Sequence, residues 1–153
     1  MKMRDRIAAA LKDAMKNKEA DRLSTLRLIN AAIKDRDIAL RGEGSEAELG
    51  DADVLAILGR MVKQRQESAR AYEEGGRLEL AEKELAEIRV IEEFLPRQLS
   101  EAEVNAAVTA AIEETGASSI RDMGRVMAVL KERYTGQMDF GAVGPAVKGR
   151  LSA

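Results

Sequence analysis

Apolar residues recur at intervals of three and four along nearly the whole chain, which is the spacing that places side chains on one face of an α-helix. The pattern predicts one helix over residues 2–18 and a second over 21–40. Two more helices follow before Pro96, and three shorter ones lie between Ser100 and Leu151. No run of alternating β-branched residues is present, so we expect no sheet.

A long helical hairpin is predicted within residues 53–99, with the chain reversing at Gly75-Gly76. Arg65 falls in the middle of the apolar face of its first helix. Glu84 falls inside the apolar stripe of the second helix, which consists of Leu78, Ala81, Leu85, Ile88 and Leu95. A charge on an apolar face is costly unless an opposite charge pairs with it. We therefore predict a structural ion pair from Arg65 to Glu84 as the first choice, or to Glu87 as the second.

Local signals mark where several helices begin. Residues 42–50 combine glycines and acids without periodicity, which favours a mobile loop. Asp51 or Asp53 is then predicted to cap the third helix. Ser100 and Glu103 form a capping-box pattern, in which the hydroxyl and the carboxylate each accept a hydrogen bond from the other residue's backbone N–H.

Two residues are unfavourable inside the helices predicted for them. Within a helix, glycine at position 59 lowers the stability by roughly 1 kcal/mol relative to alanine, so we expect a close contact with another helix there. Asp139 is predicted to open the last helix, and Pro145 should either lie near its first turn or make it begin later.

The predicted fold class is all-α, with a four-helix N-terminal region that includes the long hairpin and a smaller three-helix C-terminal domain. Proline disfavours helical geometry in the residue before it, so Pro96 marks the boundary. We accordingly predict an N-terminal domain over residues 1–96 and a C-terminal domain over 97–153.

Composition excludes several classes of function. The 153 residues contain neither cysteine nor histidine, which removes disulfides, thiolate nucleophiles, imidazole bases and nearly all zinc sites. We expect no cofactor, no metal ion and no catalytic residue.

No apolar run is long enough to cross a membrane, and the first 16 residues lack a signal-peptide core, so we expect a cytoplasmic protein that does not bind membranes.

Charge is distributed unevenly, although the formal net charge is only −2. Residues 1–41 hold eleven Lys/Arg against six Asp/Glu, and residues 42–99 hold eight against fourteen. Local clusters are thus the places to look for phosphate contacts. The candidate RNA-contact residues are Arg121, Gly124, Arg125, Lys131, Arg133 and Lys63. For each of them a solvated helix face is the alternative interpretation.

Five segments in order resemble the GatB/YqeY family: LSTLRLINAAIK (23–34), KQRQES (63–68), GGRLELAEKELAEI (75–88), FLPRQLSEAEV (94–104) and DMGRVM (122–127). The resemblance implies an all-helical fold and a likeness to the tail of the B subunit of the tRNA-dependent amidotransferase. In that enzyme the tail contacts tRNA, while activation and glutamine hydrolysis lie in other domains and subunits. Annotation by similarity would read carbon–nitrogen ligase activity with glutamine as amido-N-donor.

Three functions are therefore compared. The first is a non-catalytic module that binds tRNA or a tRNA-dependent enzyme, which is what the resemblance implies. The second is a helical protein-interaction adaptor without RNA affinity, which the acidic isoelectric point of about 5.4 favours. The third, amide transfer by this chain alone, is opposed by the missing nucleophiles. The sequence names no particular tRNA and leaves the oligomeric state open.

Overall fold

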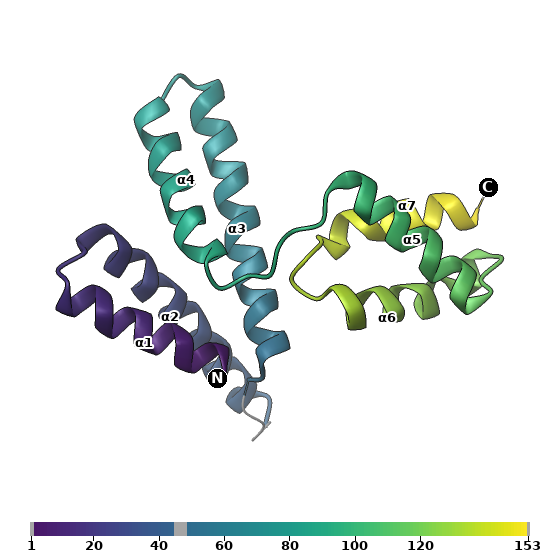
Figure 1. The fold of residues 1–153 in the computed structure, drawn as a ribbon, viewed down its shortest axis with the longest axis horizontal. Coiled ribbons are helices and arrows are strands. Elements are labelled where there is room, and N and C mark those ends of the chain that lie inside the picture. Colours follow the sequence, from purple (N-terminus) through teal and green to yellow (C-terminus); the bar gives the residue numbers. More distant parts are fainter. Residues whose placement is uncertain (1, 45–48, 153) are drawn as a thin grey trace. The chain divides into compact units, whose positions relative to one another are not determined.

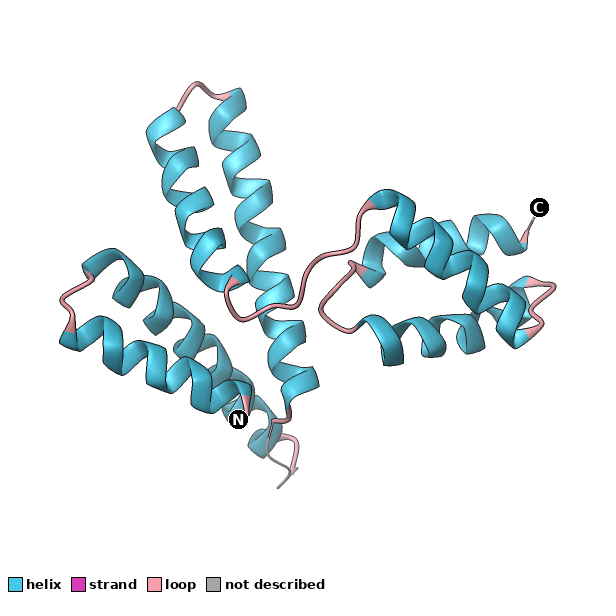
Figure 2. Cartoon of the chain, viewed as in Figure 1, coloured by secondary structure: helices cyan, strands magenta, loops and turns pink. Residues whose placement is uncertain are grey.

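The computed structural model describes residues 2–44 and 49–152, and within these residues it contains seven α-helices, one 3₁₀-helix and no strand (Figure 2). The predicted all-α fold is confirmed. The chain divides into two compact units, residues 1–95 and 96–153. Whether these units unfold as independent domains stays a prediction. The predicted mobile loop at 42–50 lies partly outside the described residues, because positions 45–48 are not among them.

The N-terminal unit consists of two antiparallel helical hairpins (Figure 1). Its helices are α1 (Met3–Lys16), α2 (Ala20–Gly42), α3 (Asp51–Glu74) and α4 (Leu78–Glu92). The reversal predicted at Gly75-Gly76 is confirmed, and Gly76 has a φ of +74°, a conformation that glycine adopts without strain.

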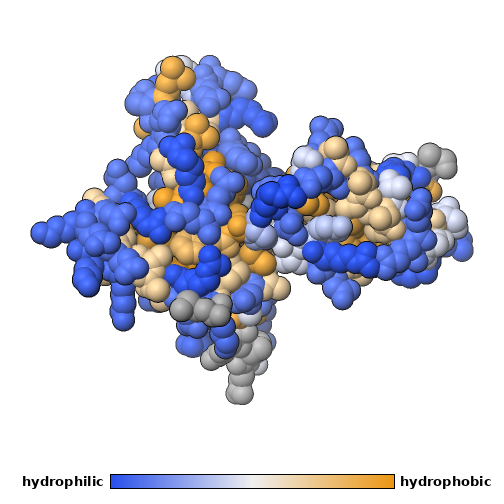
Figure 3. Space-filling model, in the orientation of Figure 1, coloured by the Kyte–Doolittle hydropathy of each residue, from blue (hydrophilic) through white to orange (hydrophobic). Residues whose placement is uncertain are grey.

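The main core of this unit lies where the two hairpins meet. Leu26, Ile29, Val54, Leu58 and Ile91 are fully buried in it, together with Leu49, Phe94 and residues of α1. The half of the α3–α4 hairpin nearest its turn buries mainly small side chains, Ala69 and Ala81. Apolar residues reach the surface at that turn (Figure 3). Leu78 there is 63% exposed, so the apolar stripe predicted for α4 is not buried at this end of the helix.

Two local predictions for α3 are wrong. Gly50, and not Asp51 or Asp53, is the N-cap residue. The Asp53 carboxylate instead reaches back to accept a hydrogen bond from the Gly50 backbone N–H at 3.0 Å, and that of Asp51 accepts one from the Met3 N–H at 3.1 Å. Gly59 has no close helix contact, since a Cβ there would meet no described atom within 4 Å.

The C-terminal unit packs three helices around its own core (Figure 1). They are α5 (Glu101–Thr115), α6 (Met123–Tyr134) and α7 (Phe140–Leu151), with the 3₁₀-helix η1 (Ile120–Asp122) directly before α6. Val108, Val126, Leu130 and Val147 are at most 1% exposed and form the centre of this core.

Helix α7 begins earlier than Pro145 suggested. Asp139 caps it, as predicted, and its carboxylate accepts a hydrogen bond from the Gly141 N–H at 3.0 Å. Pro145 lies inside the helix, beyond its first turn, so the predictions for this proline are wrong. The buried residues on either side of it, Val143 and Val147, hold the helix against the core although proline has no N–H to donate.

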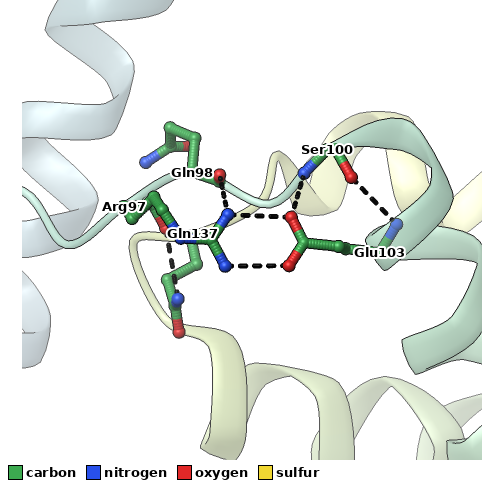
Figure 4. Close-up of polar contacts among 5 residues, drawn as sticks. All are labelled: Arg97, Gln98, Ser100, Glu103 and Gln137. Atoms are coloured by element: carbon green, nitrogen blue, oxygen red, sulfur yellow. Dashed lines mark hydrogen bonds and ion pairs between the residues drawn. The ribbon is translucent and has the colours of Figure 1, made fainter.

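The segment before α5 is tied to the rest of the C-terminal unit (Figure 4). The Leu99 N–H donates to the Gln137 carbonyl at 2.9 Å, and the Gln137 side chain donates to the Arg97 carbonyl at 3.1 Å. Ser100 and Glu103 form the predicted capping box, with hydrogen bonds of 3.1 Å and 3.0 Å. Arg97 adds two contacts of 2.8 Å to the Glu103 carboxylate.

Candidate functional site

The outward face of α6 holds three of the six predicted RNA-contact residues, and a fourth lies in η1 just before it. Val126 and Leu130 are fully buried on the opposite side of this helix. Gly124, Arg125 and Lys131 of α6 are all exposed, and helical periodicity places these positions within about 120° of rotation around the helix axis. Arg121 is also exposed and lies in η1, directly before α6. The structure thus places three of the candidates on one face of α6, with Glu132 on the same face, and Arg121 just before the helix begins.

Arg125 is held by neighbours of its own unit. Its guanidinium lies 2.6 Å from the Asp122 carboxylate and 3.3 Å from the Thr115 carbonyl. The same carboxylate accepts the backbone N–H of Ser118 at 2.9 Å and that of Ser119 at 3.3 Å. The Ser118 N–H, followed by Arg125, lowers the pKa of Asp122. Arg125 therefore contributes to the start of α6.

Arg133 does not share the face. It follows Lys131 by two residues, which is about 200° of rotation around the helix, and it pairs with Glu114 of α5. The hydrogen bond from Arg133 lowers the pKa of the Glu114 carboxyl. This arginine bridges α5 and α6.

Arg121 and Lys131 are the other two candidate cations of the C-terminal unit. Within the part of the chain that the structure describes, neither side chain has an ion-pair or hydrogen-bond partner. Gly124 lies between them, and a Cβ added there would meet nothing within 4 Å. Its lack of a side chain leaves the backbone open to an approaching molecule.

Lys63 lies on α3 of the N-terminal unit, so the structure assigns it to a different unit from the other five candidates. It is exposed on the helix surface.

The predicted ion pair of the hairpin forms with the second-choice partner. The Arg65 Nε donates to the Glu87 carboxylate at 2.9 Å, and another of its nitrogens donates to the Met61 carbonyl at 3.2 Å. The side chains of Arg65 and Glu87 are 14% and 18% exposed, so the pair is largely withdrawn from water. The first choice, Glu84, is wrong, since among the described residues it pairs with no cation.

Sequence reasoning missed a row of exposed cations on α2, formed by Arg27, Lys34 and Arg41. Their spacing of seven residues was the available signal, since two helical turns return a side chain to nearly the same direction.

The described residues contain no group of three or more Asp, Glu, His or Cys side chains arranged to hold a metal ion. None of the described helices is both long and apolar enough to span a membrane.

Comparison with known proteins gives a family and three relatives. The family model described as "Yqey-like protein" matches residues 4–151. An uncharacterized protein of Schizosaccharomyces pombe is 32% identical over 94 residues, which are 61% of this chain and 72% of that protein.

Two further relatives share the name "Altered inheritance of mitochondria protein 41, mitochondrial". The one from Pyrenophora tritici-repentis is 28% identical over 134 residues, covering 84% of this chain and 71% of the relative. The one from Lachancea thermotolerans is 29% identical over 106 residues, covering 68% of this chain and about half (54%) of the relative. Because the family match extends over almost every residue, the chain belongs to the YqeY-like family.

Proposed function

We propose that this protein is a non-catalytic module that binds tRNA, or a tRNA-bound enzyme, through phosphate contacts at η1 and on the outward face of α6. The observation that carries the proposal is the pair of unpartnered cations, Arg121 and Lys131, on either side of Gly124. A cation that lacks a carboxylate partner can neutralise a phosphate without first breaking an ion pair. The open backbone at Gly124 lets a sugar–phosphate chain approach the helix closely.

The proposal assigns no chemical step to this chain. Its sequence lacks the cysteine and histidine that most acyl-transfer catalysts use as nucleophile and base. We expect purified protein to release no ammonia from glutamine and to amidate no aminoacyl-tRNA. An ammonia-releasing activity that co-purifies with the protein through successive columns would contradict this part of the proposal.

The cytoplasmic location that the sequence favours also stays a prediction. The names of two relatives include the word "mitochondrial".

Filter binding to total tRNA over a salt series tests the proposal. We expect the affinity to fall as salt rises, because phosphate neutralisation releases counterions. The double variant Arg121→Ala, Lys131→Ala should bind more weakly, with a salt dependence about 1.5 to 2 units shallower in log–log slope.

The matched control is Arg60→Ala, Lys83→Ala. It removes the same charge from two exposed residues of the N-terminal unit that have no described partner. Equal weakening by both double variants would mean that bulk charge, and not the α6 face, binds RNA. Absence of tRNA binding at low salt would overturn the proposal in favour of a protein-interaction adaptor.

A further inference from the structure

The outward face of α2 carries three cations in one line. Arg27, Lys34 and Arg41 follow one another at intervals of seven residues, so their side chains project within about 40° of one another. The first and last are about 21 Å apart along the helix axis. All three are exposed, as are Ala31 and Ile38 between them, and Ile38 is 65% exposed.

No described residue neutralises this row. None of the three cations has an ion pair or a hydrogen-bond partner within residues 2–44 and 49–152. Of the nearby carboxylates, that of Asp37 is occupied by Arg4 of α1 through contacts of 2.8 and 3.3 Å. Asp35 lies in the neighbouring row of the helix, about 80° or more from each of the three.

Another face of α2, centred about 110° around the helix axis from the row, is buried in the core, and this limits the kind of ligand that the row can take. Leu26, Ile29 and Ile33 are at most 2% exposed in the main core of the N-terminal unit. A helix that binds a membrane surface must insert its apolar face into the lipid. Since α2 has buried its main apolar face, its outward side offers a rigid line of positive charge, beside which only Leu28 and Ile38 expose large apolar side chains.

We infer that the row Arg27–Lys34–Arg41 is a second phosphate-binding face, for the sugar–phosphate backbone of an RNA. A linear array of unpaired cations complements a linear array of phosphates, and the small or apolar residues between the cations leave the ribose edge room to approach. The inference rests on the proposed function and deepens it, because it assigns RNA contacts to the N-terminal unit in addition to α6.

The test compares two triple variants of the full chain in tRNA filter binding across a salt series. The first is Arg27→Ala, Lys34→Ala, Arg41→Ala. The control, Arg60→Ala, Arg70→Ala, Arg89→Ala, removes three exposed cations without described partners from α3 and α4 of the same unit. Alanine is a strong helix former, so circular dichroism should show unchanged helix content in both.

We expect the α2 triple variant to lose about tenfold or more in affinity near physiological salt, and roughly 2 to 3 units of log–log salt slope. The control should stay close to the wild type. A third variant, Asp35→Asn, should bind tRNA more tightly, because it removes a negative charge beside the row without removing a cation.

The alternative outcomes separate this inference from the proposed function. If the wild type binds tRNA and the α2 triple variant binds with the same affinity as the control triple variant, the α2 face is overturned and the α6 proposal survives. If the wild type does not bind, both are overturned. If poly-glutamate displaces tRNA as effectively as unlabelled tRNA does, the row recognises acidic chains in general and the assignment to RNA phosphates is overturned.

Discussion

At the scale of single residues, the buried charge of the α3–α4 hairpin was found from periodicity, but its partner was ranked wrongly. Arg65 lies nine residues before the end of α3 at Glu74, and Glu87 lies nine residues after the start of α4 at Leu78. Two residues at equal distances from the turn of an antiparallel hairpin are level. The two glycines indicate where the chain turns. The register between α3 and α4 also depends on where each helix ends, and the sequence did not show that α3 ends at Glu74 and α4 begins at Leu78.

The Arg65–Glu87 pair should matter most when it is broken on one side. We expect Arg65→Met or Glu87→Met to lower the free energy of unfolding by about 1 to 3 kcal/mol, because the remaining charge is left largely buried. The double variant with methionine at both positions should lie within about 1 kcal/mol of the wild type. Urea unfolding followed by circular dichroism measures all three.

The control for this series is Glu84→Met, on the same helix one turn earlier. Because Glu84 has no cation partner among the described residues, its replacement should change the unfolding free energy by less than about 0.5 kcal/mol. Single variants as stable as this control would show that the pair contributes nothing to hairpin stability.

Glu103 provides a pH prediction. Hydrogen bonds from Arg97, and next from the Ser100 backbone, lower the pKa of Glu103 from 4.5 to about 2. A carboxyl group with a depressed pKa stabilises the folded state fully above its unfolded pKa and loses that contribution as the pH falls through its folded pKa. The start of α5 should therefore loosen between about pH 4.5 and pH 2.

Carboxyl NMR titration measures the Glu103 pKa directly. Arg97→Ala should move it upward toward its ordinary value, because the largest cause of the shift is removed. A midpoint for Glu103 that stays near 2 in this variant would contradict the assignment to Arg97.

At the scale of helices, the three-and-four spacing was enough to predict each of the seven α-helices in the described part of the chain, while the ends of the helices were less predictable. Leu49 falls in a stretch without periodicity and is nevertheless 6% exposed in the core, a contact that only tertiary packing creates. Leu78 fits the stripe of α4 but lies beside the turn, where no third helix covers it, so it is exposed. The spacing of apolar residues identifies which face of a helix is apolar. It does not show over what length of the helix other elements cover that face.

Two helical glycines offer a further test at this scale. Gly59 and Gly124 have open space at the Cβ position and no positive φ, so alanine at either should raise the unfolding free energy by roughly 0.5 to 1 kcal/mol. Gly76→Ala should do the reverse, because its φ of +74° is unfavourable for a residue with a Cβ.

Gly124→Ala also separates stability from function. If an RNA backbone approaches α6 at this residue, the variant should be more stable but bind tRNA less tightly. Gly59→Ala is the matched control, with a similar gain in stability and unchanged binding. Equal binding by both variants would remove Gly124 from the proposed contact.

At the scale of the whole molecule, the chain divides into two compact units between Leu95 and Pro96, and the domains that the sequence predicts over residues 1–96 and 97–153 stay a prediction. The sequence did not show that residues 97–99 are already bound to the C-terminal unit, because their partner Gln137 is some 40 residues away.

The RNA faces were harder to predict. Charge counts pointed to α6 and could not show that Arg125 and Arg133 are occupied by carboxylates.

The boundary predicts how fragments should behave. A fragment of residues 96–153 should show cooperative thermal unfolding, because it keeps the Ser100 cap, half-buried Leu99 and the Gln137 hydrogen bonds. A fragment of residues 101–153 should be less stable by at least about 1 kcal/mol, the usual cost of losing an N-cap. Circular dichroism melts of both fragments and of the full chain check this, and equal stability of the two fragments would contradict it.

The turn of the α3–α4 hairpin has a practical consequence for anyone who needs to attach something to this protein. Gly75, Gly76 and Arg77 are exposed, and the large side chains of the main core lie toward the other end of the hairpin. Lengthening a surface loop costs little, since the closure entropy grows only with the logarithm of its length. A foreign peptide such as an antibody epitope, inserted after Arg77, should be displayed while the helices of the hairpin stay folded.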